Sequence, residues 1–311
     1  MLSVHKDLAA TYSIVAIDTE RGEMGAAVQS HFFSVGSVVP WAVPGKGVVA
    51  TQAMVNRSYG PDGIEQLKNG REPAEIVRSL TGADEGSAYR QLAVLDAQGR
   101  IAAHTGGACI RDAGHIVGDS YSVQANMMRN PGVPEAMAEG FERSTGALAR
   151  RLSAALHAAE RAGGDIRGKQ SAALIVVRSS FEGHPAEATV EDLRVDDHKA
   201  PLQELDRLLN LSAGYRELER GDELLSTGSW EEAMAAYHRA EERAPENPEI
   251  QFWHGVALLQ EGYRDQAEAK LLPLCRRSRG WWELLGRLNE AELAKIPEEV
   301  MGGLAAELGY S

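Results

Sequence analysis

The chain has 311 residues and a formal net charge of −13. This length accommodates a full hydrophobic core and a second domain. The acidic balance excludes nucleic acid and anionic membranes as main partners, because both need a concentrated basic surface.

The first ten residues contain Lys6 and Asp7 and lack an apolar core. They are too short and too polar for a secretory signal. Two cysteines, Cys109 and Cys275, lie far apart and give no disulfide framework, which suits a reducing compartment. We therefore expect a cytoplasmic protein.

Thr11 heads an apolar segment and follows the small residues Ala9 and Ala10. Residues 12–18 and 24–30 predict two strands joined by a Gly-bearing turn. A Thr whose own amine is the chain terminus carries nucleophile and base together, because the amine can take the hydroxyl proton. Thr is also common in strands, and this segment alone favours an ordinary strand residue.

The first 195 residues alternate between strands and helices. Further strands are predicted over residues 48–53, 90–96, 100–105 and 171–177. Helices are predicted over residues 63–69, 74–81, 134–144 and 147–162. The last strand is a continuous apolar run, which indicates burial on both faces. Periodicity alone gives a mixed α/β domain, and two packed sheets with helices outside would account for such a strand.

From about residue 200 the chain becomes rich in Leu, Ala, Glu and Arg, and it contains a repeat. Five positions recur with an offset of 34 residues: Gly221, Leu224, Leu225, Gly228 and Ala233 reappear as Gly255, Leu258, Leu259, Gly262 and Ala267. That offset is the tetratricopeptide period, with one helical hairpin per unit. Helices over residues 202–219 and 281–289 are expected to cap the array.

Four tryptophans accompany the repeats: Trp230, Trp253, Trp281 and Trp282. They could line a partner groove or fill the core. Core positions are favoured for most of them, because large aromatic side chains commonly fill helical-repeat interfaces.

A set of motifs extends from Thr11 to about residue 200. They occupy residues 11–16, 27–41, 50–52, 59–61, 103–106, 121–127, 163–173 and 193–198. In these motifs the sequence resembles a bacterial family known as domain of unknown function 1028. The resemblance implies the N-terminal nucleophile (Ntn) hydrolase fold, a four-layer αββα sandwich.

We therefore predict an α+β chain in which this sandwich is followed by an all-α helical-repeat domain. The expected boundaries are an N-terminal extension or propeptide over 1–10, the sandwich over 11–200, the repeats over 201–290 and a helical tail over 291–311.

In the Ntn interpretation Thr11 is the nucleophile, and its attack needs hydrogen-bond donors for the developing oxyanion. Asn126 is the first candidate among the strand amides, followed by Gln124 and Gln52. A structural amide that ties a loop is an equally good interpretation of Asn126. Ser30, like Ser13, could hold the terminal amine or be a small strand residue.

Substrate contacts are expected from two histidines and one arginine, together with Gln52 and Gln124. His31 and His104 could orient substrate or move a proton, although a structural role is as common. Arg167 could hold a substrate carboxylate with its planar fork. The alternative is a surface pair between Asp165 and Arg167.

Metal and cofactor chemistry is not indicated. His104, Cys109 and His115 match no tetrahedral zinc spacing. No phosphate-binding Gly-rich loop follows a strand, so we expect no nucleotide.

The sequence thus predicts a hydrolase for an amide or peptide bond of a small substrate. It requires cleavage before Thr11, because the nitrogen of an intact Ala10-Thr11 bond is an amide and cannot act as a base. The rival interpretation is a non-catalytic scaffold whose repeats recruit a peptide or protein. A homodimer is expected, because both architectures lend themselves to oligomers.

Overall fold

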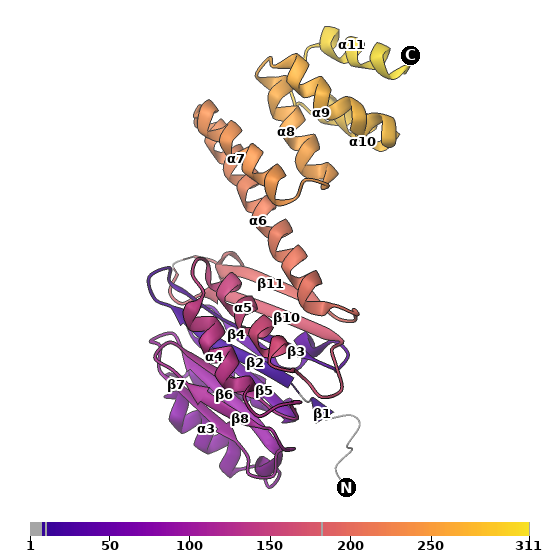
Figure 1. Cartoon of the computed structure of the whole chain (residues 1–311). Coiled ribbons are helices and arrows are strands. Elements are labelled where there is room, and N and C mark those ends of the chain that lie inside the picture. Colours follow the sequence, from indigo (N-terminus) through magenta and orange to yellow (C-terminus); the bar gives the residue numbers. More distant parts are fainter. Residues whose placement is uncertain (1–7, 10, 182, 311) are drawn as a thin grey trace. The chain divides into compact units, whose positions relative to one another are not determined.

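The computed structural model describes residues 8–9, 11–181 and 183–310 (Figure 1). By contacts the chain divides into two compact units, Met1–Leu209 and Asn210–Ser311. Helix α6 (Pro201–Ser226) continues across that boundary, so its first turns belong to the first unit and the remainder to the second.

The first sheet of the first unit contains Thr11. It consists of β2 (Thr11–Asp18), β3 (Glu23–Ser30), β8 (Gly114–Val117), β9 (Tyr121–Ala125), β10 (Ser171–Arg178) and β11 (Thr189–Val195). The described strands follow the order β11-β10-β3-β2-β9-β8, and neighbours are antiparallel. The central strands β2 and β3 are buried along their whole length, as their apolar sequences require.

The second sheet packs against the first. It is formed by β1 (Leu8–Ala9), β4 (Pro40–Val43), β5 (Gly47–Met54), β6 (Arg90–Asp96) and β7 (Ile101–Thr105). The order is β1-β5-β6-β7, and β4 also pairs with β5. The core between the sheets includes Val15, Val28, Val48 and Leu95, none of which has any surface exposed.

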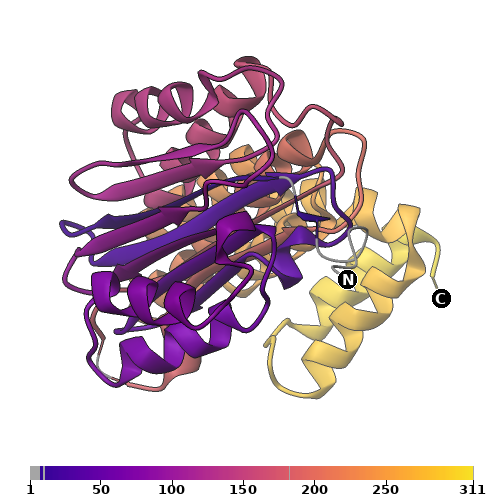
Figure 2. The same ribbon diagram turned by 90° about the horizontal axis from the view of Figure 1, so that it is seen from below.

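Helices cover the outer face of each sheet. Helices α2 (Tyr59–Lys68) and α3 (Pro73–Gly82) pack on the second sheet, and α4 (Val133–Arg143) and α5 (Leu148–Arg161) pack on the first. Figure 2 shows the purple pair and the magenta pair on opposite sides of the two sheets. The predicted four-layer αββα arrangement is confirmed.

The second unit is helical. It continues α6 with α7 (Trp230–Arg243), α8 (Pro248–Gln260), α9 (Arg264–Arg277), α10 (Arg279–Glu290) and α11 (Glu298–Leu308). The predicted offset of 34 residues is visible in the turns, because Gly228 and Gly262 have φ of 78° and 82°. Gly255, another position of the repeat, lets α8 and α9 pack closely, because a Cβ at this position would lie 2.7 Å from Leu271 Cγ.

The predicted end of the helix that precedes the repeats is wrong. Residues 202–219 were expected to form a separate capping helix, but α6 runs on to Ser226 and supplies the first helix of the first hairpin. No proline or positive-φ glycine interrupts residues 202–226, and the helix ends just before Gly228.

The four tryptophans are half-buried and pack around the apolar core of the second unit. The same core contains Phe252, Leu258 and Leu271. The four tryptophans therefore contact the core, as expected for most of them. No helix among the described residues is long and apolar enough to span a membrane.

Candidate functional site

Strand alternation places a group of polar side chains between the two sheets. On β2, Val15 and Ile17 face the inter-sheet core, so Thr11 and Ser13, which have the same parity, face it too. The same alternation directs Ser30, Gln124, Gln52, Gln91 and Thr105 into the same space. Thr11, Ser13, Ser30, Gln52 and Gln91 have no exposed surface.

Thr11 lies at the end of the first sheet, opposite Ser30 on β3. Its Oγ1 donates a hydrogen bond to Ser30 Oγ at 3.2 Å. Its carbonyl oxygen accepts three: from the Asn126 backbone N at 3.1 Å, from Asn126 Nδ2 at 3.3 Å and from Gln52 Nε2 at 3.2 Å. The structure thus brings together four residues that the sequence predicts: Thr11, Ser30, Gln52 and Asn126.

The remaining predicted amide, Gln124, is linked to this group through Ser13. Gln124 Nε2 donates to Ser13 Oγ at 2.9 Å, and Ser13 Oγ donates to Gln52 Oε1 at 2.6 Å. Ser122 Oγ in turn donates to Gln124 Oε1 at 3.0 Å. Each amide therefore has a defined orientation, and Gln52 must direct its Nε2 away from Ser13 and toward Thr11.

Gln91 is the hub of the network, and it is not among the residues predicted from the sequence. Its Oε1 accepts from Gln52 Nε2 at 2.9 Å and from Asn126 Nδ2 at 2.8 Å. Its Nε2 donates to the carbonyl oxygens of Ala125 at 2.9 Å and Gly114 at 3.2 Å, and to Thr105 Oγ1 at 3.0 Å. The signal was present, because an amide begins the apolar strand of residues 91–95.

The side-chain amide hydrogens of Asn126 and Gln52 already take part in hydrogen bonds within the protein. Each NH2 group has two hydrogens, and those of Asn126 have acceptors in the Thr11 carbonyl and Gln91 Oε1. Those of Gln52 are shared among the same two acceptors and the Gln124 carbonyl. In this state the amides hold the carbonyl of Thr11 itself, and their role at an oxyanion stays a prediction.

The residue directly after each of the two amides has a positive φ. Ala53 follows Gln52 and has φ of 72°, and Met127 follows Asn126 and has φ of 57°. The left-handed region is costly for a residue with a Cβ, and such strain persists where surrounding contacts over-determine the chain. Here the hydrogen bonds of the two amides and the pairing of Ala53 with Ala9 supply those contacts.

Comparison with known proteins places this arrangement in a family. The model described as "Family of unknown function (DUF1028)" matches residues 11–205. The chain belongs to this family. A crystal structure of a DUF1028 protein from Silicibacter pomeroyi is 35% identical, with a TM-score of 0.58, and the match covers 64% of this chain and 87% of that one. A TPR repeat model matches residues 221–262. No curated protein matches this chain.

Asp165 ties together two of the remaining predicted residues of the DUF1028 domain. The carboxylate is fully buried, accepts from the His31 backbone N at 3.1 Å and pairs with Arg167 at 2.8 and 3.1 Å. The pair between Asp165 and Arg167 was one of the two interpretations of Arg167. It is not a mere surface pair, because it fixes the loop of residues 165–168 beside His31. A carboxylate ligand would have to share the guanidinium with Asp165.

His104 does not join the Thr11 group. It lies opposite Leu92 across β6 and β7, and Leu92 belongs to the core beneath α2 and α3, so His104 is on the outer face of its sheet. Its Nε2 lies 3.0 Å from the Ser87 carbonyl oxygen. His115 is the histidine connected to the network, because its Nδ1 lies 2.8 Å from Thr105 Oγ1. Burial, with a contribution from His104, lowers the pKa of His115.

Two surface pockets of the DUF1028 domain lie away from Thr11. One lies between α4 and α5 and is lined by Gly140 and His157, among others. The other lies at the opposite end of β2 and includes Asp18 and Arg151. Neither pocket reaches the buried network.

Proposed function

We propose that the Thr11 end of the sandwich is the site of an Ntn-type hydrolase that cleaves an amide or peptide bond of a small substrate. The observation that carries the proposal is the position of Thr11. Thr11 begins the inner strand β2. Its hydroxyl donates to Ser30, and its carbonyl oxygen accepts three hydrogen bonds. A nucleophile benefits from such fixed placement, because a displacement of 1 Å can cost orders of magnitude in rate.

In this mechanism the residues before Thr11 are removed, and the new terminal amine takes the hydroxyl proton as Oγ1 attacks the substrate carbonyl. The terminal ammonium passes that proton to the substrate nitrogen, the C–N bond breaks to release the amine, and water then hydrolyses the ester on Thr11 to release the acid. Removal of residues 1–10 also takes away β1, which pairs Leu8 with Met54 and Ala9 with Ala53. Backbone groups of β5 beside Gln52 then become accessible, and we propose them as supplementary oxyanion donors.

The test is the intact mass of the full chain after expression, followed by N-terminal sequencing and a panel of amide substrates. Thr11→Ser keeps a hydroxyl and should retain both cleavage and hydrolysis. Thr11→Val has nearly the same shape without the hydroxyl and should lose hydrolysis. A wild-type chain that keeps the residues before Thr11 would refute the mechanism.

The second candidate is a non-catalytic binding protein whose repeats recruit a peptide or protein. It is favoured by the complete burial of Thr11 and by the committed donors of Gln52 and Asn126. The TPR match over residues 221–262 is consistent with a protein-binding role. Capture of the same partner by wild type and by Thr11→Val, together with no hydrolysis, would select this function.

A further inference from the structure

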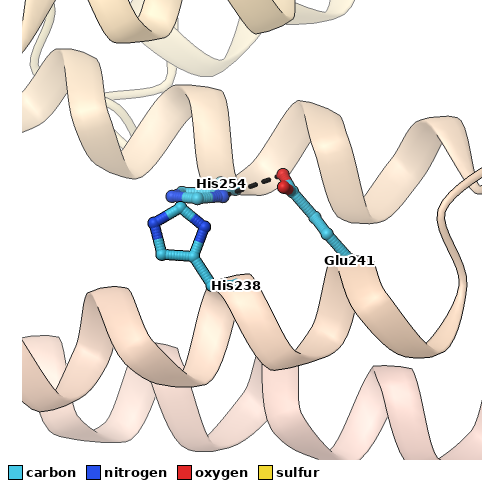
Figure 3. Close-up of side chains that lie close together, drawn as sticks. All are labelled: His238, Glu241 and His254. Atoms are coloured by element: carbon cyan, nitrogen blue, oxygen red, sulfur yellow. Dashed lines mark hydrogen bonds and ion pairs between the residues drawn. The ribbon is translucent and has the colours of Figure 1, made fainter.

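Three metal-ligating side chains meet in the helical unit, outside the site described above. His238 and Glu241 are three residues apart on α7, so they lie on one face of that helix. His254 on α8 faces them (Figure 3). One ligand atom from each of the three lies within 4.8 Å of the other two.

The three residues differ in burial in a way that suits a site entered from solvent. His254 is 1% exposed and stacks on Tyr237, with ring centroids 5.1 Å apart. Its Nδ1 lies 2.8 Å from Glu241 Oε1. His238 is exposed, and its ring stands at 85° to that of His254. The exposed His238 can rotate while the other two ligands stay in place.

The geometry points to a binding site for a divalent transition metal such as Zn²⁺, with His238, Glu241 and His254 as its protein ligands. Two imidazoles and one carboxylate are a donor set that Zn²⁺ accepts, with water in the fourth position.

The metal would replace the hydrogen that now lies between His254 and Glu241. A tetrahedral ion about 2.0 to 2.1 Å from each atom needs them about 3.3 Å apart, so the pair must open by about 0.5 Å. The ring stays neutral, with its hydrogen on Nε2 instead of Nδ1. These movements are small for side chains on adjacent helices.

Lys270 competes with the metal. Its Nζ lies 2.7 and 2.9 Å from the two carboxylate oxygens of Glu241, so the charged Lys270 side chain already forms an ion pair with this carboxylate. Metal binding requires this ion pair to loosen. The competition gives the proposal a specific signature, because removal of the Lys270 charge should tighten binding.

The ion would join the two repeats, because α7 belongs to the first helical hairpin and α8 to the second. A ligand that binds the folded state and not the unfolded one raises the apparent stability. We therefore expect Zn²⁺ to raise the melting temperature of the helical unit.

The experiment uses the full chain treated with a chelator and titrated with Zn²⁺ by calorimetry, and with Co²⁺ by visible absorption. His238→Ala removes a proposed ligand and should weaken Zn²⁺ binding by about 100-fold or more. Loss of a residue that only hydrogen-bonds to a ligand already costs about 10- to 100-fold. Lys270→Met should strengthen it. The control is His157→Ala, which removes a histidine paired with Asp206 at 2.7 Å in the other unit and should leave the titration unchanged.

Three results would overturn the site. The first is a wild-type chain that takes up no Zn²⁺ at micromolar concentrations. The second is a His238→Ala variant that binds as well as wild type. The third is a Co²⁺ spectrum that keeps the weak absorption of the hydrated ion. His238 is exposed, so its replacement leaves the core packing intact and the comparison stays informative.

Discussion

Replacement of Gln91 by leucine tests whether the buried network holds the sandwich together. Gln91 accepts two hydrogen bonds from Gln52 and Asn126, and its two amide hydrogens serve three acceptors. Four bonds at about 1 kcal/mol each amount to about 4 kcal/mol. The apolar side chain recovers about 1 kcal/mol by burial. We expect Gln91→Leu to lower the free energy of unfolding of the first unit by about 3 kcal/mol.

Hydrogen exchange with peptide-level mass spectrometry is the suitable assay, because the two units can unfold separately. The slowest amides of β6 and β9 should exchange roughly 100-fold faster in the variant, as each 1.4 kcal/mol is a factor of ten. Peptides from α8 in the other unit serve as the internal reference. The control is Gln98→Leu at an exposed turn, which should change the free energy of opening measured by exchange by less than about 0.5 kcal/mol.

Exchange in β6 and β9 that stays within about 0.5 kcal/mol of wild type would refute this reasoning. It would mean that water or a rearranged Asn126 replaces the Gln91 contacts at little cost. The hub would then be a consequence of packing and would not hold the Thr11 end in place.

Three further predictions concern other parts of the chain. Gly25→Ala would place a Cβ 2.3 Å from the Ile175 carbonyl oxygen on β10, so overpacking should cost about 2 to 3 kcal/mol, seen as faster exchange in β3 and β10. Burial alone would raise the pKa of Asp84, but hydrogen bonds from Arg90, Gly86, Tyr59 and Asn56 lower it to about 2. A lowered folded-state pKa stabilises above the unfolded value, so about 2 kcal/mol should be lost as pH falls from about 4 to 2, and Asp84→Asn should flatten that loss in acid titrations. In the second unit, Gly286→Ala in α10 should add about 0.5 to 1 kcal/mol, whereas Gly228→Ala, at φ of 78°, should cost about 1 kcal/mol. Tryptophan fluorescence during urea unfolding reports both, and equal effects of the two glycine replacements would contradict the argument.

Several features of the candidate site could be predicted because they depend on strand alternation. Thr11 and Ser30 share the parity of core-facing neighbours such as Val15 and Val28, so both had to point inward. Gln52, Gln124 and Asn126 are the strand amides that the sequence predicts. Gln52 and Asn126 donate to the Thr11 carbonyl, and Gln124 is linked to them through Ser13. The face of His104 could not be predicted from its motif, and its strand partner Leu92 places it on the outer face of the second sheet.

The sequence by itself determined the strands β2, β3, β5, β6, β7 and β10, the helices of the first unit, the order of the units and the repeat period, because these follow from alternation, turn residues and a constant offset of 34 residues. It also placed a Thr at the head of a strand. The tertiary structure alone decided that Gln91 is the hub, that Asp165 also holds the His31 backbone and that His238 and Glu241 meet His254. Each of these contacts joins segments that are separate in the sequence, and the local pattern of one segment does not encode how it packs against another.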